Sequence, residues 1–110
     1  MDMQLHEDAR TPICADLFVQ IEQLEQNCRS MTLPALHEAI DEIRNKATAH
    51  GMVALEGIAH AFERSIAKHR DATAFSLYFD QLKLATGCID NDDAKARDTM
   101  LAAISVRLAG

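Results

Sequence analysis

The chain has 110 residues, the size of a single domain with one hydrophobic core. Hydrophobic residues make up 48% of it and charged residues 25%, a balance typical of a folded globular protein rather than a disordered one. The formal net charge of -6 argues against a protein that binds nucleic acid, because non-specific binding of that kind depends on clustered lysine and arginine.

The sequence shows no pattern that would carry the chain to or across a membrane. No apolar run approaches the ~18 residues of a membrane span, and the N-terminal MDMQLHEDAR has neither the basic start nor the apolar centre of a signal peptide. We therefore expect a cytoplasmic protein that binds no membrane. Residues 1–10 are predicted to form a flexible N-terminal tail and residues 11–110 a single helical-bundle domain.

Three cysteines, Cys14, Cys28 and Cys88, lie far apart in the sequence. An odd number of cysteines without a CxxC spacing is more typical of reduced thiols than of a disulfide framework or a zinc site. We interpret them as small core residues.

Apolar residues recur every three or four positions, which predicts helices with one buried face. Thr11 caps a first helix over about residues 12–30 with Pro12 at its first position, and Thr32 and Pro34 open a second helix that ends at Gly51. The apolar stripes of these two helices are Ile13, Leu17, Ile21, Leu24 and Cys28, followed by Leu33, Leu36, Ile40, Ile43 and Ala47.

Three further helices are predicted in the second half of the chain. The third runs to the basic segment 68–70, the fourth begins after Asp71 and ends before Gly87, and the fifth begins in the acidic run 90–93. Their stripes are Met52, Leu55, Ile58, Ala59, Phe62 and Ile66, then Phe75, Tyr78, Phe79, Leu82 and Ala85, then Leu101, Ile104 and Leu108. Because short connections place successive helices antiparallel, we predict an all-α fold, an up-and-down four-helix bundle with one accessory helix.

The second and third predicted helices carry a set of residues at characteristic offsets. The set begins with Ile43 and Arg44 on the second helix. In chain order, the remaining positions are Ala47, Gly51, Met52, Leu55, Phe62 and Glu63. At these offsets the segment resembles the histidine phosphotransfer (HPt) domains of bacterial multistep phosphorelays. Their motif reads His, any residue, Leu, Lys, Gly, small residues, a glycine ten positions after the His, and a helix ending in Leu-Glu. The resemblance covers about thirty residues closely and implies an HPt-like bundle.

The resemblance places Asp41, ten residues before Gly51, where the family has its nucleophilic histidine. Asn45 stands where the family has a glycine that gives a receiver domain close access. A carboxylate cannot form the phosphoramidate that an imidazole nitrogen forms during phosphorelay transfer. The resemblance therefore implies a degenerate member that lacks the phosphoacceptor histidine and displays a fixed negative charge beside Arg44.

The predicted partner-binding residues are His37, Asp41, Arg44, Asn45 and Thr48. Positions 37, 41, 44 and 48 share one helical face by their spacing of four, three and four. His37 lies one turn before Asp41, and two interpretations are open for it. It is either a displaced phosphoacceptor or one member of a solvated polar pair with Asp41.

Glu56, His60 and Glu63 also share a helical face, which raises the question of a metal site. Di-iron sites in helical bundles use a Glu-x-x-His pair from each of two helices, and no histidine here has a glutamate three residues before it. We interpret the row as surface charge pairs and expect neither a metal nor a cofactor. His50 is predicted to be a partly buried histidine at a helix end.

No nucleophile elbow and no glycine-rich phosphate loop indicates an enzyme. We expect a non-catalytic HPt-like signalling or adaptor module that binds a response-regulator receiver domain or a histidine kinase without relaying phosphate. One alternative is an active histidine phosphotransferase that uses His37. Another is a structural oligomeric helical protein, for example a homodimer, with Val106 on its self-association face.

Overall fold

The computed structural model describes residues 10–68, 72–87 and 94–109, and these segments are helical with short connections. The elements are α2 (Arg10–Asn27), the short 3-10 helix η1 (Cys28–Ser30), α3 (Leu33–Ala49), α4 (Val53–Ile66), α5 (Ala72–Thr86) and α6 (Ala94–Ala109). No strand occurs in the described ranges, so the prediction of an all-helical fold is confirmed.

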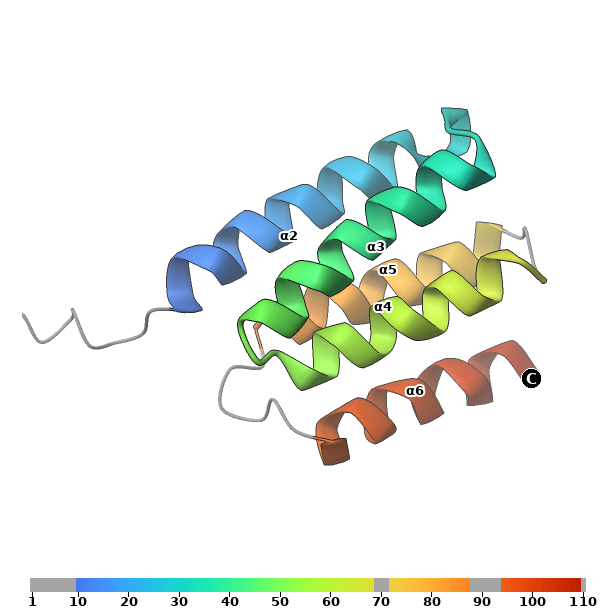
Figure 1. Cartoon of the computed structure of the whole chain (residues 1–110). Helices are drawn as coiled ribbons and strands as arrows, with labels where there is room; N and C mark the ends of the chain where they lie inside the picture. The colour runs from blue at the N-terminus through green and yellow to red at the C-terminus, as the bar shows by residue number, and fades with distance from the viewer. Residues whose placement is uncertain (1–9, 69–71, 88–93, 110) are drawn as a thin grey trace, which may run out of the picture.

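The α-helices lie side by side, with α4 at the centre of the packing (Figure 1). Helix α4 packs against α3, α5 and α6, while α2 packs against α3 and α5. None of the helices in the described part of the chain is both long enough and apolar enough to cross a membrane.

The buried core follows the apolar stripes expected from the sequence. Fully buried large side chains come from four helices and from the residue before α4: Leu17, Ile21, Leu36, Ile40, Ile43, Met52, Leu55, Ile58, Phe62, Phe79 and Leu82. Cys14 and Cys28 are buried, as predicted, whereas Cys88 lies outside the described residues. The stripe on α6 departs most from expectation, because Ile104 is buried but Leu108 is exposed.

Helix α3 begins and ends where the sequence predicted. Thr32 is the N-cap, and its hydroxyl oxygen accepts a hydrogen bond from the Ala35 amide at 3.2 Å. At the other end, Gly51 has a φ of +67°, which glycine adopts without strain. The Met52 amide donates to the Ala47 carbonyl at 2.8 Å and the Gly51 amide to the Thr48 carbonyl at 3.2 Å, the paired bonds of a Schellman motif. This tight ending lets α4 turn back against α3.

Helix α2 differs from its predicted limits at both ends. It begins at Arg10, which was assigned to the tail, and its last predicted turn is the separate 3-10 helix η1. Thr11 and Pro12 therefore lie inside the first turn, where proline is tolerated because its missing N–H has no intrahelical acceptor. Residues 1–9, the Asp71 cap and the acidic run 90–93 lie outside the described residues.

Candidate functional site

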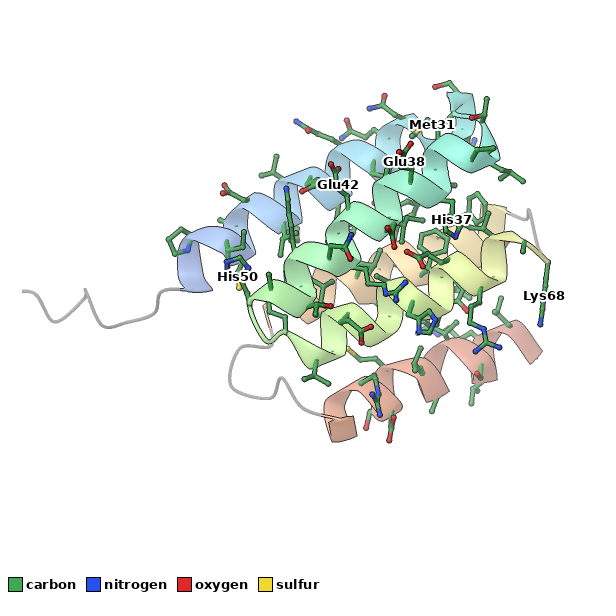
Figure 2. The ribbon with its side chains drawn as sticks, in the orientation of Figure 1. Met31, His37, Glu38, Glu42, His50 and Lys68 are labelled. Atoms are coloured by element: carbon green, nitrogen blue, oxygen red, sulfur yellow. The ribbon has the colours of Figure 1, made fainter. Side chains whose placement is uncertain are left out.

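The predicted partner-binding residues lie along α3, and Arg44 among them contacts α4. His37 lies in the first half of α3 and His50 beyond its other end (Figure 2). The side chains of Asp41 and Arg44 are 44% and 32% exposed, while His37, Asn45 and Thr48 are exposed. The face is thus open to a partner along most of its length.

Arg44 is held by three carboxylates from two helices. Its Nη1 donates to Glu63 Oε1 of α4 at 2.8 Å, the short distance of a charge-assisted hydrogen bond. Its Nε lies 3.5 Å from Glu56 Oε2, and Nη1 lies 3.5 Å from Asp41 Oδ1. The guanidinium group therefore joins the predicted docking face of α3 to α4.

Glu63 is the buried member of this cluster. The residue is 6% exposed, and its Oε2 atom has no hydrogen-bond partner in the described protein. The prediction that Glu63 belongs to a row of surface charges is therefore wrong. The spacing places Glu56, His60 and Glu63 on one face of α4, but α3 packs against the end of that face and buries Glu63.

Burial and neighbouring charges change the proton affinity of this pair. Burial raises the pKa of the Glu63 carboxyl, and the nearby Asp41 carboxyl raises it further, while Arg44 lowers it without reversing the shift. Burial lowers the pKa of Arg44, but the hydrogen bond and charge of Glu63, together with the charges of Asp41 and Glu56, outweigh burial and raise it. Arg44 therefore favours the charged form of Glu63, and Glu63 favours the charged form of Arg44.

The structure brings the side chains of Asp41, Arg44 and Asn45 together, and the side chains of the other two predicted residues do not join them. Asn45 Nδ2 lies 3.5 Å from Asp41 Oδ2. Thr48 instead uses its hydroxyl to donate to the Arg44 carbonyl at 3.0 Å, a bond within its own helix. The His37 side chain makes no hydrogen bond or ion pair with any described residue, so it forms no direct pair with Asp41.

His50 also departs from its predicted environment. It is exposed rather than partly buried, and its Nδ1 lies 3.0 Å from the Lys46 carbonyl oxygen near the end of α3. The residue takes this position because the chain turns at His50 and Gly51, so the helical spacing from Ile43 no longer sets its direction. It belongs to the helix ending and not to the face of α3 described above.

A shallow cavity of about 400 Å³ lies beside Asp41 on α3, and sequence reasoning missed it. The small side chains of Ala35 and Ala39 leave this space open, and its charged lining consists of Glu38, Asp41 and Glu42. Glu38 and Glu42 lie on the α2 side of α3 (Figure 2), where Gln20 Nε2 lies 3.5 Å from Glu42 Oε1. The signal in the sequence is the pair of alanines four residues apart, which share a face with no large side chain.

Residues 10–68, 72–87 and 94–109 contain no set of side chains positioned as metal ligands. No group of three or more histidine, cysteine, aspartate or glutamate side chains there is arranged to hold a metal ion. In the row considered from the sequence, His60 is exposed and Glu56 faces Arg44.

Comparison of the chain with protein-family models, curated proteins and solved structures gives no match.

Proposed function

We propose that this protein is a non-catalytic HPt-like module that binds a receiver domain or a histidine kinase. In this proposal α2, α3, α4 and α5 form the up-and-down antiparallel bundle and α6 is the accessory helix. The short connections α2–α3 and α3–α4, the contacts between successive helices and the matching positions on α3 and α4 support it.

The observation that carries the proposal is the half-exposed Asp41 beside an arginine anchored from α4. Asp41 occupies the position at which the resemblance places a nucleophilic histidine, and Arg44 lies 3.5 Å from it. Since Arg44 is fixed by the 2.8 Å bond to Glu63, the charge pattern next to Asp41 is preformed. A preformed surface loses little side-chain entropy when a partner binds.

The mechanism of such a module is occupancy. Its α3 face would cover the phosphorylation surface of the partner and so compete with phosphotransfer. Glu38, Asp41 and Glu42 give the face a negative edge, which complements a basic edge on the partner and speeds association. Asn45, exposed next to Asp41, sets the closest approach of the partner backbone.

Replacing Asp41 with lysine is expected to weaken binding to the cognate receiver domain or kinase by about ten-fold or more, because it places a like charge against a basic edge. Binding of the purified protein to receiver domains and kinases from the same genome can be measured by isothermal titration calorimetry. Asp80→Lys, at an exposed site on α5, makes the same charge change on a helix that packs against α2, α4 and α6, and it serves as the control. Binding to none of these domains, or an equal loss for both variants, contradicts the proposal.

A second candidate function is phosphotransfer through His37, and the exposure of that imidazole favours it. The reaction would move a phosphoryl group from a receiver aspartyl phosphate to a ring nitrogen of His37 and regenerate the receiver carboxylate. We expect no radiolabel on the wild-type protein after incubation with labelled receivers. Label on the wild type that is absent from His37→Ala would replace the occupancy mechanism with this one.

A further inference from the structure

A shallow cavity of about 550 Å³ lies between α4 and α6. Its volume falls in the range of about 300–1,000 Å³ that is usual for small-molecule sites. Basic side chains of both helices line it, and Tyr78 of α5, Leu101 and Leu108 supply apolar surface. Neither the HPt resemblance nor the proposed docking function uses this cavity.

Basic side chains cluster at the cavity, although the net charge of the protein is -6. Arg64, Lys68 and Arg97 line it, which is three of the 11 lysines and arginines in the chain. Lys68 extends from the end of α4 on the side of α6 (Figure 2). Clustering of this kind produces a local positive potential that attracts anions.

The two acidic residues of the lining are already paired with arginines. Glu56 Oε2 lies 3.5 Å from Arg44 Nε, outside the cavity lining, and Asp98 Oδ1 lies 3.2 Å from Arg97 Nε. Arg64 and Lys68 form no ion pair with any residue in the described part of the chain. Within the described segments, the cavity therefore holds two cations without a carboxylate paired to them.

Helix electrostatics account for only part of this arrangement. Basic residues near the C-terminal end of α4 interact favourably with the helix dipole, which is a structural reason for Arg64 and Lys68. Arg97 lies near the N-terminal end of α6, where the dipole disfavours a cation. Its side chain packs over Gly57 of α4, where an added Cβ would overlap it. Gly57 thus makes room for a cation that the dipole does not favour.

The apolar surface of the cavity indicates an organic ligand rather than a simple ion. The Tyr78 ring stacks on Phe62 with centroids 4.9 Å apart and is 8% exposed, so it forms a rigid surface. Leu108 is 41% exposed although it belongs to the predicted apolar stripe of α6. A bound apolar group would remove that surface from water.

We propose that this cavity binds a small organic phosphomonoester, with its phosphate on Arg64 and Lys68 and its apolar body against Tyr78, Leu101 and Leu108. A phosphomonoester carries a charge of about -1.5 to -2 at neutral pH, which matches Arg64 and Lys68, the two cations of the lining that form no ion pair with a described residue. The guanidinium group of Arg64 adds a forked donor geometry suited to phosphate oxygens. The site rests on the α4–α6 cavity alone and is independent of receiver binding.

The test uses phenyl phosphate as the probe and the full chain as the protein. Titration followed by amide chemical shifts is expected to show saturable binding with the largest shifts on α4 and α6. The variant Arg64→Gln/Lys68→Gln is expected to bind about ten-fold more weakly or worse. Arg29→Gln/Lys46→Gln removes the same two charges from exposed positions outside the cavity and is expected to bind like the wild type.

Inorganic phosphate tests whether charge attraction alone explains binding, because it lacks the apolar group of phenyl phosphate. It is expected to bind at least about ten-fold more weakly than phenyl phosphate. No saturable binding of phenyl phosphate overturns the site. Equal loss in the two double variants shows that net charge alone attracts the probe, and equal binding of inorganic phosphate shows that the apolar surface takes no part; either result also overturns the proposal.

Discussion

Replacing Phe62 with alanine is expected to lower the free energy of unfolding by about 4 kcal/mol, a large share of the roughly 5–15 kcal/mol that stabilises a domain. Phe62 is fully buried on α4 and contacts three other rings, Phe75, Tyr78 and Phe79, with centroids 5.5, 4.9 and 5.1 Å away. The alanine variant loses apolar transfer energy and these ring contacts, and it leaves a cavity where α4 meets α5. Urea denaturation followed by far-UV circular dichroism measures the loss.

Phe18→Ala is the matched control for this prediction. Phe18 lies on α2 and is 36% exposed, so the same truncation is expected to cost about 1 kcal/mol or less. If Phe62→Ala destabilises the protein no more than Phe18→Ala, the aromatic cluster does not have the role in the core that the structure gives it.

Periodicity predicted which faces would be buried because a helix repeats its direction every 3.6 residues. Leu17 and Ile21 on α2 and Ile40 and Ile43 on α3 are all fully buried, as their spacing requires. Gly51 could be predicted as well, because few other residues tolerate the left-handed conformation that ends α3. That local requirement also explains the glycine without reference to any family.

Contacts between helices could not be predicted in the same way. The sequence places Arg44 and Glu63 on separate helices 19 residues apart, and only the packing of α3 on α4 brings them to 2.8 Å. For the same reason, Leu108 matched an apolar stripe but stays exposed, since the position of α6 on α4 decides what that stripe meets. Residue spacing gives the face of one helix and does not give its neighbour.

In the candidate site, too, the features of a single helix could be predicted and the contacts between helices could not. The spacing of residues 37, 41, 44 and 48 predicted a common face, and Asp41 and Arg44 are in contact on it. The buried partner Glu63 and the cavity at Ala35 and Ala39 were not predicted as parts of the site, because both depend on how α3 sits against other elements.

Replacing Arg44 with methionine is expected to destabilise the protein by about 2–3 kcal/mol at pH 7, because it leaves the buried Glu63 carboxylate without its cation. The cost is below the ~3–5 kcal/mol of a fully buried pair, since the Arg44 side chain is 32% exposed. Lys83→Met is the control. This variant breaks the 2.8 Å ion pair between Lys83 and Glu25, whose side chains are 25% and 30% exposed, respectively. Because Glu25 keeps access to water, the loss is expected to be about 1 kcal/mol or less.

Acidification is expected to reduce the deficit of Arg44→Met. The folded chain already raises the pKa of Glu63 above its ordinary value of 4.5, and loss of Arg44, which lowers that pKa, raises it further. A carboxyl with a raised pKa binds its proton more tightly in the folded state, so its contribution to stability falls as pH rises from about 4.5 through the raised pKa. Unfolding midpoints in urea at pH 7 and near pH 4.5 test this, and the same deficit at both values would contradict it.

Glu63→Gln separates the charge of Glu63 from its position in the core. Because the folded state favours the protonated form of Glu63, a neutral amide of the same shape is expected to cost little at pH 7. In the double variant Arg44→Met/Glu63→Gln most of the loss from Arg44→Met should be recovered, since no buried charge is left unpaired. Glu63→Gln thus gives a stable protein in which Arg44 has lost its closest carboxylate. Its affinity for a receiver domain then reports whether anchoring Arg44 serves the docking face or only the fold.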